Sequence, residues 1–534
     1  MTFRKITFLS FVLVSFSVES VAQNAQGSPV NGTVIFYMIL LFLAVLILLA
    51  DQFLGVSGLK NKGSFLGTSK LPSFVQGKPI HVLKKGFDIK LEGNPSSVIT
   101  DKMVSRFAIQ PPNYRGIAPI PKLEIAEGQE VKAGDPIFFD KSNPHIKYVA
   151  PVSGEVIAVN RGEKRAISEI IILADKEQKY RAIPALKYDQ VSREELVGFL
   201  MEYGAWPLIK QRPYNIVANA DVIPENIFIS TFDTAPLSPD NNAIIAGQEN
   251  AFYAGIGALS HLTSGKVYLG LDAKAQPDAT FRQAPAEKVY FHGPHPAGNV
   301  GIQIHHISPI GRGQRVWTLN VQDVIIIGKL FTEQRFDSTR IVGIGGKYFS
   351  NPRLLRTHSG ANIGELVQGE LEDGHFRLIS GDVLSGQKKT VDGFVNFSDD
   401  QVTVLEEGDY YELFGWLLPL NPRPSASRTY PNFLFGDTEY SGDTNTHGEK
   451  RAFVVSGQYE DMLPMDIYPQ QLFKAIITND FERMEGLGIY ELVEEDVALC
   501  PFVVVLGKLF ELQGLSQWFY CLAELFPVCI GNTN

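Results

Sequence analysis

The chain has 534 residues, of which 45% are hydrophobic and 20% are charged. This length is too great for one hydrophobic core and predicts about three or four domains, and the composition excludes a disordered chain. Acidic residues outnumber basic residues by 58 to 48. Binding to phosphate backbones needs a basic surface, so nucleic acid is excluded as a partner.

The three cysteines are all close to the C-terminus, at Cys500, Cys521 and Cys529. An odd, terminal set provides no disulfide framework and favours a reducing compartment for the body of the chain. Iron–sulfur clusters need about four thiolates at short spacing, so we predict that no cluster is bound.

The N-terminus carries two apolar segments. Residues 1–22 have basic residues before an apolar run and end in small residues at Ala22, which predicts a signal peptide. Residues 33–50 are almost unbroken in apolar character, and their length suits one transmembrane helix that ends at Asp51. Lysines follow this segment and no charge lies just before it, so the positive-inside rule predicts a single-pass protein with its body in the cytoplasm.

After a linker over residues 51–78, short strands and tight turns begin. The segments Glu124–Phe138 and Val149–Arg165 each combine turn glycines with alternating apolar residues. Two such half-motifs are typical of a biotinyl/lipoyl-like barrel-sandwich domain, predicted here over residues 79–185. The joint between them reads DKSNPHIK and lacks the usual setting of a modifiable lysine, so we predict no covalent cofactor.

The next segment alternates strands and helices. A capping box at Ser192 and Glu195 predicts a helix that stops at Gly204. Strands are predicted over 226–232, 266–271 and 288–292, with a helix over 247–263. This alternation predicts a Rossmann-like α/β domain with a parallel sheet over residues 186–300.

Strands are predicted again from Ile302, with apolar, β-branched runs over 316–327 and 339–344 around a helix over 362–368. This pattern suits a β-grasp module over residues 301–390. A loop-rich β segment follows over 391–460, then a C-terminal helical region over 461–534, with helical character over 469–497. The fold class predicted for the chain is therefore α+β multidomain.

Two glycine-containing segments approach a dinucleotide-binding fingerprint. Residues 255–260 (GIGALS) lack the third glycine and lie inside a predicted helix, and residues 343–346 (GIGG) follow a strand but do not lead into a helix. The fingerprint works at a strand-to-helix turn, where backbone N–H groups meet the pyrophosphate. Neither segment predicts a nucleotide site.

Four histidines cluster in one stretch, at His292, His295, His305 and His306, and could ligate zinc. The stretch is rich in Gly and Pro and has no cysteine nearby, so loop histidines bonded to the backbone are the favoured interpretation.

Two aspartates are further candidates for binding. Asp233, with Thr234, follows a predicted strand, where a parallel sheet commonly places ligands; a capped turn is the alternative. Asp51 could give one sodium ligand, although a helix boundary is the commoner role. No Ser/His/Asp or Cys/His constellation is readable, so no catalytic residue, cofactor-binding residue or metal ligand is assigned.

Several segments resemble, in order, the NqrA family of the Na+-translocating NADH:quinone oxidoreductase. The matching stretches are APVSGEVIAVNRGEKR (150–165), RPY (212–214), DTAPL (233–237), HPAGNVGIQIH (295–305), VWTLNVQDVIIIGKLF (316–331), PRLLRTHSG (352–360), LFGW (413–416), PMDI (464–467) and EEDVALC (494–500). Each is short, but the ordered set covers about residues 79 to 503.

The resemblance implies membership of a bacterial inner-membrane complex with five other subunits, which passes electrons from NADH to quinone and exports Na+. It also implies that residues 301–390 are SLBB-like and that NADH, FAD, FMN and the 2Fe-2S centre belong to other subunits. Quinone is an implied partner without assigned residues. Where a flavin-binding relative would have a glycine-rich loop, residues 203–208 read YGAWPL, with one glycine and Trp206.

Two features depart from the family. The N-terminal signal and span are an added anchor, and the tail after Val503 is apolar and atypical, either a membrane-contacting end or the product of a frame error. The alternative function is a membrane-anchored scaffold or adaptor that has a lipoyl-like module and no redox role.

Overall fold

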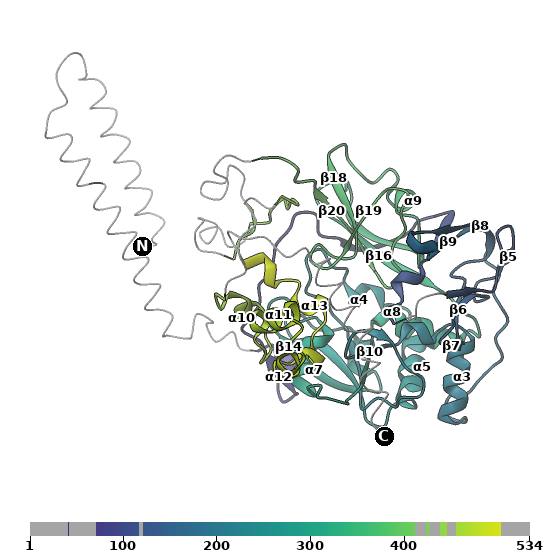
Figure 1. Cartoon of the computed structure of the whole chain (residues 1–534), viewed down its shortest axis with the longest axis horizontal. Coiled ribbons are helices and arrows are strands. Elements are labelled where there is room, and N and C mark those ends of the chain that lie inside the picture. The colour runs from purple at the N-terminus through teal and green to yellow at the C-terminus, as the bar shows by residue number, and fades with distance from the viewer. Residues whose placement is uncertain are drawn as a thin grey trace, which may run out of the picture. The chain divides into compact units, whose positions relative to one another are not determined.

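The computed structural model describes residues 71–116, 121–411, 423–426, 438–445 and 455–503, together with Leu41. The chain divides into two compact units, Met1–Leu71 and Pro72–Asn534, and the second contains every strand and helix named below (Figure 1). Apart from Leu41, the predicted signal peptide, the predicted span and Asp51 lie outside the described residues. Within the described part, no helix is both long and apolar enough to cross a membrane.

A seven-stranded sheet forms the centre of the α/β domain, in the order β1-β14-β13-β12-β15-β10-β11. The first five strands of this order pair in parallel, and β10 and β11 are antiparallel. The predicted parallel, Rossmann-like arrangement is confirmed. The strands are β1 (Ile80–Val82), β10 (Lys210–Arg212), β11 (Ile216–Val217), β12 (Ile227–Ser230), β13 (Val267–Asp272), β14 (Glu287–His292) and β15 (Val316–Leu319).

The helices of this domain begin where the sequence supplies caps. At α3, the Ser192 hydroxyl accepts a hydrogen bond from the Glu195 N–H, and the Glu195 carboxylate accepts one from the Ser192 N–H, which confirms the predicted capping box. The helices are α3 (Arg193–Glu202), α4 (Asn241–Ile244), α5 (Glu249–Ser260), α6 (Ala279–Gln283), α7 (Val300–Ile307) and α8 (Val321–Thr332).

The strand predicted over residues 316–327 is wrong in its second half. The chain leaves β15 at Leu319, and the Asn320 side chain accepts a hydrogen bond from the Asp323 N–H, which starts α8. Almost every residue of α8 is buried, so its apolar, β-branched composition resembles that of a buried strand. The strand predicted from Ile302 is likewise wrong, because Ile302 lies in α7. Since β15 and α8 complete this domain, the predicted boundary at residue 300 falls inside it.

Helices α5 and α8 approach closely because glycines face the partner backbone. A Cβ added at Gly328 would lie 1.7 Å from the Ala251 carbonyl oxygen, and one at Gly255 would lie 2.3 Å from the Val324 carbonyl oxygen. The first glycine of the GIGALS segment therefore serves helix packing.

The barrel-sandwich region consists of two small sheets, as predicted. One has the order β3-β9-β8-β5 and the other β4-β6-β7. The joint between the half-motifs is the hairpin of β6 and β7, with Lys141 exposed at its turn. The strands are β3 (Arg106–Ile109), β4 (Pro121–Leu123), β5 (Glu130–Val131), β6 (Pro136–Asp140), β7 (Asn143–Val149), β8 (Gly154–Arg161) and β9 (Ile167–Ala174).

A six-stranded sheet forms the SLBB-like domain, in the order β19-β18-β20-β16-β17-β2. Helix α9 (Ile363–Val367) is capped by the Asn362 side chain, which confirms the helix predicted there. The strands are β2 (Ser96–Asp101), β16 (Thr339–Gly345), β17 (Arg353–His358), β18 (Phe376–Ser380), β19 (Gln387–Lys389) and β20 (Gln401–Glu406).

The edge strands correct two predicted domain limits. β1 and β2 both come from the segment assigned to the barrel-sandwich domain, yet they join the α/β sheet and the SLBB-like sheet. β20 lies beyond the predicted end of the β-grasp module at residue 390 but pairs inside its sheet. The N-terminal segment thus ties two sheets together.

The C-terminal region packs on the α/β domain as short helices (Figure 1, yellow, beside β14 and α7). Leu472 and Met484 share a buried cluster with Phe291, Ile302 and Cys500. The helices are α10 (Gln458–Met462), α11 (Pro469–Ile477), α12 (Phe481–Gly486) and α13 (Glu494–Val497). The other two cysteines and the tail after residue 503 lie outside the described residues.

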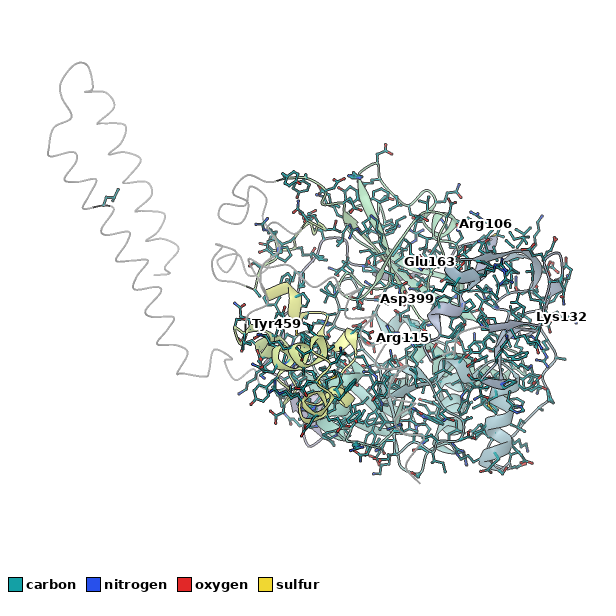
Figure 2. The ribbon with its side chains drawn as sticks, viewed as in Figure 1. Arg106, Arg115, Lys132, Glu163, Asp399 and Tyr459 are labelled. Carbon is teal, nitrogen blue, oxygen red and sulfur yellow. The ribbon has the colours of Figure 1, made fainter. Side chains whose placement is uncertain are left out.

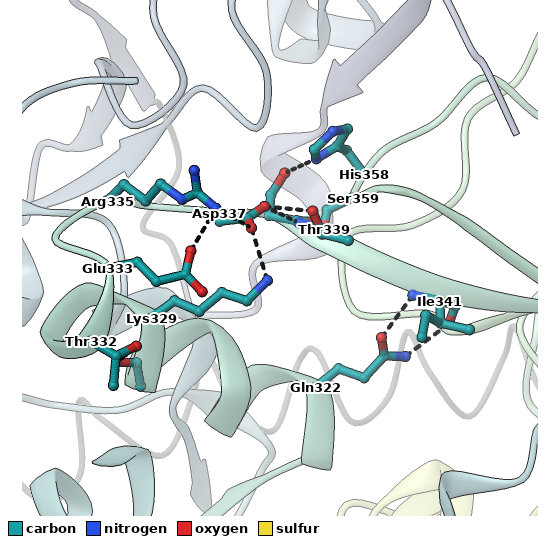
Figure 3. A network of polar contacts seen from close by, with 12 residues as sticks. Gln322, Lys329, Thr332, Glu333, Arg335, Asp337, Thr339, Ile341, His358 and Ser359 are labelled. Carbon is teal, nitrogen blue, oxygen red and sulfur yellow. Dashed lines mark hydrogen bonds and ion pairs between the residues drawn. The ribbon is translucent and has the colours of Figure 1, made fainter. Parts of the chain in front are cut away.

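A polar network joins the α/β domain to its neighbours (Figure 3). Lys329 of α8 lies 2.8 Å from an Asp337 carboxylate oxygen, and the Thr339 hydroxyl donates to Asp337 at 2.5 Å. Next to them, Ser338 donates to the Pro151 carbonyl oxygen of the barrel-sandwich domain at 2.6 Å. Buried ion pairs with additional hydrogen bonds hold a fixed geometry, so this network sets how α8, β16 and the barrel-sandwich domain meet.

Replacing Gly328 by Ala should lower the free energy of unfolding by about 1 to 3 kcal/mol, because the new methyl group forces α5 and α8 apart. The control is Gly198→Ala in α3, where a Cβ has open space and should instead stabilise by up to about 1 kcal/mol. Denaturant unfolding of both variants checks the prediction. Equal effects of the two substitutions would contradict it.

The Lys329–Asp337 pair should make stability fall in acid. Burial would raise the pKa of Asp337, but the Lys329 charge and the hydrogen bonds from Lys329 and Thr339 lower it to about 2. A lowered carboxyl pKa stabilises the fold above the ordinary value, and this contribution disappears as pH falls towards the folded-state value. Asp337→Asn should therefore cost about 2 kcal/mol at pH 7, and the gap to wild type should close between about pH 4 and 2. A gap that is independent of pH would rule this out.

Candidate functional site

A cavity of about 440 Å³ lies at the carboxyl ends of the parallel strands. Ser230 and Phe232 line it at the end of β12, and Leu319 and Asn320 line it at the end of β15. These two strands are neighbours, but the chain leaves β12 towards β13 on one side and returns to β15 on the other. The cavity therefore lies at the topological switch point, where open α/β sheets bind ligands.

All the structural parts of the body contribute to the wall. Residues 112–115 come from the barrel-sandwich region, residues 380–382 and 399–401 from the SLBB-like domain, and residues 493–495 from the C-terminal region. Arg115 and Asp399 are both found near the middle of the body in Figure 2. The site is thus built from segments far apart in the sequence.

The wall is rich in carboxylates. Seven acidic side chains line it against three basic ones: Asp233, Asp323, Asp382, Asp399, Asp400, Glu494 and Glu495 against Arg115, Lys210 and Arg212. A net negative charge inside a cavity repels phosphate and carboxylate ligands.

Three acidic groups at or behind the wall are paired with arginines. Arg115 lies 2.6 Å from Glu494, and Arg340 lies 2.6 Å from Asp323. Asp496 lies behind the wall, where its carboxylate is 3.1 Å from the Arg212 guanidinium, and both side chains are almost fully buried.

Lys210 occupies the wall from β10, which pairs with β15. Its ammonium forms no hydrogen bond with any residue in the described part of the chain. Burial lowers the pKa of Lys210, opposed by the charges of Asp323, Glu495 and Asp399. The ammonium is therefore held among carboxylates by charge alone.

Two carboxyl groups have strongly raised pKa values. Burial, and then the neighbouring Asp233, raise the pKa of Asp400 to about 7. Burial, and then Asp496, raise the pKa of Glu495 to about 7. Glu495 is open to the cavity although protein surrounds it, so both effects act on a group that a ligand could reach. Closely spaced carboxylates of this kind cannot all be ionised near neutral pH.

The segment Glu494–Asp496 closes the site with the chain's own anions. Glu494 and Asp496 neutralise Arg115 and Arg212, and Asn299 holds the segment by donating to the Glu495 carbonyl oxygen at 3.0 Å. The two guanidinium groups that could have bound a phosphate are thus already paired.

The segment YGAWPL does not form a phosphate cradle. Trp206 is fully buried, donates from Nε1 to the Ala218 carbonyl oxygen at 2.7 Å and packs edge-on against Trp317 at 5.4 Å. Gly204 has a φ of 78°, and an added Cβ would lie 2.2 Å from the Val149 side chain. This glycine ends α3 against the barrel-sandwich domain.

The structure unites both interpretations of Asp233. Its carboxylate accepts a hydrogen bond from the Ala235 N–H at 2.8 Å, which forms the capped turn, and it also lines the cavity. The Thr234 hydroxyl pairs with His295 Nδ1 at 3.1 Å and accepts from the Gly298 N–H.

The other candidate histidines have separate partners. His305 Nδ1 lies 2.8 Å from Glu491, and His306 Nε2 donates to the Pro464 carbonyl oxygen at 2.8 Å. Neither is in a loop, because both lie on α7. Among the described residues, no group of three or more His, Cys, Asp or Glu side chains could hold a metal ion, so the zinc hypothesis gains no support.

The second glycine segment, GIGG, ends β16. The Gly346 N–H donates to the Gly93 carbonyl oxygen at 2.9 Å, and Gly346 has a φ of 126° close to the Val404 backbone. It serves a tight backbone approach between strands.

The sequence did not identify Lys210, Asp399, Asp400 or Glu495 as site residues. The available signals were the adjacent acidic pairs, and the RPY, DTAPL and EED stretches that also point to the family. These stretches meet at the cavity only in the folded chain.

Comparisons with known proteins agree with these three domains. A family model described as the NqrA N-terminal barrel-sandwich hybrid domain matches residues 81–175. The model for the NqrA second alpha/beta domain matches residues 191–336, and the model for the NQRA C-terminal domain (SLBB) matches residues 341–390.

Curated relatives match over most of their length. The NqrA protein of the Na(+)-translocating NADH-quinone reductase of Vibrio atlanticus is 39% identical over 425 residues, which cover 79% of this chain and 94% of the relative. The proteins of the same name from Yersinia pestis and Hahella chejuensis are 37% and 38% identical with the same coverage. A solved NAD+-reducing [NiFe]-hydrogenase overlaps 43% of this chain and 52% of its own at 11% identity with a TM-score of 0.31, too little to carry an argument.

Three domains in family order and this extent of identity establish that the chain belongs to the NqrA family of the Na+-translocating NADH-quinone reductases.

Proposed function

We propose that this chain works as the NqrA component of a Na+-translocating NADH-quinone reductase, a translocase in which quinone reduction is coupled to Na+ export. The observation that carries this proposal is the similarity to NqrA proteins across all three domains and nearly their whole length. The chain would then work in a membrane-associated complex together with other subunits, five in the arrangement that the family resemblance implies.

In this proposal the chain itself holds no flavin, nicotinamide nucleotide or iron–sulfur cluster, and the NADH, FAD, FMN and 2Fe-2S centres belong to other subunits. The acidic cavity supports this. Nucleotide phosphates bind where free backbone N–H groups and cations converge, usually at a helix N-terminus. Here the carboxylates of Asp233, Asp400 and Glu495 face the same space, and Arg115 and Arg212 are already paired.

Quinone contact, if it involves this chain, is proposed to lie outside the cavity. Ligand sites for large apolar molecules are lined mainly by hydrophobic and aromatic side chains. The wall described here consists mostly of acids, amides and hydroxyls, which do not suit an isoprenoid tail. An interface with a membrane subunit is the alternative place for such contact.

We further propose that the segment 33–50 anchors the chain by a single pass with residues 79–503 on the cytoplasmic side. The support is the apolar length of the segment and the lysines after it. Protease should digest this body in inverted vesicles and spare it in intact spheroplasts, and the reverse pattern would refute the orientation. The scaffold alternative, an anchored adaptor without a redox role, has no specific observation in its favour.

Purification from native membranes tests the main proposal. An affinity-tagged chain solubilised in mild detergent should bring down flavin-bearing membrane subunits, and the eluate should oxidise NADH with added quinone in a Na+-stimulated manner. A mock purification from untagged cells is the control. Recovery of the chain alone from fully solubilised membranes would contradict membership of the complex.

A further inference from the structure

We propose that the cavity at the switch point binds a small organic cation that carries a primary ammonium group. This property would belong to the chain alone and does not depend on the proposed role in the pump.

The first reason is the charge left in the wall after the internal ion pairs are counted. Glu494 is neutralised by Arg115, Asp323 is paired with Arg340, and Arg212 is occupied by Asp496. The remaining acidic groups face only one further cation, Lys210, and they are Asp233, Asp382, Asp399, Asp400 and Glu495. Opposite charge is therefore the complement that the cavity lacks.

The second reason is a buried acceptor without a partner. Asn396 is 8% exposed and lines the cavity next to Asp399, to which its Nδ2 donates at 2.9 Å. Its Oδ1 has no hydrogen-bond partner among the described residues. A buried acceptor of this kind is costly unless something donates to it. A ligand ammonium has three donors and could reach both the amide oxygen and the adjacent carboxylate.

The cavity already accommodates one ammonium group. Lys210 projects among Asp323, Asp399 and Glu495 without a direct hydrogen bond to a described residue. The wall thus stabilises a primary ammonium by charge over several ångströms. The ligand would add a second such group next to Asp400 and Asn396.

Size and chemistry separate an organic cation from the other candidates. A space of about 440 Å³ is in the range of small-molecule sites. In the described part of the chain no cluster of His, Cys, Asp and Glu is close enough to hold a metal ion. Phosphates and carboxylates would meet the unpaired acids.

Calorimetric titration of the purified full-length chain tests this inference, with 1,4-diaminobutane and ethanolamine as the probes at constant ionic strength. Saturable binding to one site per chain is expected for at least one of them. The neutral 1,4-butanediol should not bind. Absence of saturable binding for both amines up to millimolar concentration, or equal binding of the diol, would overturn the inference.

Substitutions locate the binding. Asp400→Asn and Glu495→Gln should each weaken the amine at least tenfold, because each removes a carboxylate from the wall. Asp373→Asn, an exposed aspartate outside the cavity wall, is the matched control and should change nothing. Retained binding in both cavity variants would overturn the inference, as would an equal loss in the control.

Lys210→Met adds a test of opposite sign. Removing the internal ammonium should tighten amine binding several-fold, since the ligand no longer competes with it. A folding defect cannot mimic this result, because misfolding weakens binding. Weaker amine binding in a variant with an unchanged melting temperature would contradict a cation site.

Discussion

The crowding of carboxylates at the carboxyl edge of the parallel sheet is the constraint on which the rest of the site depends. An open α/β sheet offers its switch-point crevice to ligands, and here the crevice is filled with negative charge. Burial and mutual repulsion keep some of these groups near the point of protonation, as the pKa values of about 7 for Asp400 and Glu495 show. A site of this kind is unsuited to phosphate and suited to protons or cations.

The domains are arranged so that this charge stays enclosed. β1 and β2 extend two different sheets from one N-terminal segment, and α8 joins the SLBB-like and barrel-sandwich domains through Asp337 and Ser338. The C-terminal helices cover the α/β core and end in Glu494–Asp496, which closes the cavity against Arg115 and Arg212. The fold thus keeps the framework of a ligand-binding α/β domain while its own carboxylates occupy the anion-binding positions.

Much of the fold was predictable where local chemistry decides it. The capping box at Ser192, the strands at 227–230, 267–272 and 287–292, and the helix capped by Asn362 all follow from short-range signals. The strand predicted through Ile327 failed because α8 is buried on nearly all sides, and full burial removes the periodicity that separates helix from strand. Domain limits failed where β1 and β2 cross to other sheets.

The candidate site was less predictable, because it is assembled by long-range contacts. Asp233 was identified from its place after a strand, but Lys210, Asp399 and Glu495 are separated by many residues and gave no local pattern. Only the tertiary fold reveals that the carboxylates outnumber the available cations.

The ability of the isolated chain to hold flavin tests the central claim most directly. The full-length chain should be purified away from other subunits, titrated with FMN and examined by absorbance after removal of free ligand. We expect no retained flavin band and no iron–sulfur absorbance, with an unchanged melting temperature in the presence of FMN. Stoichiometric FMN or iron in the folded chain would contradict the claim that the acidic crevice has replaced a phosphate-binding site.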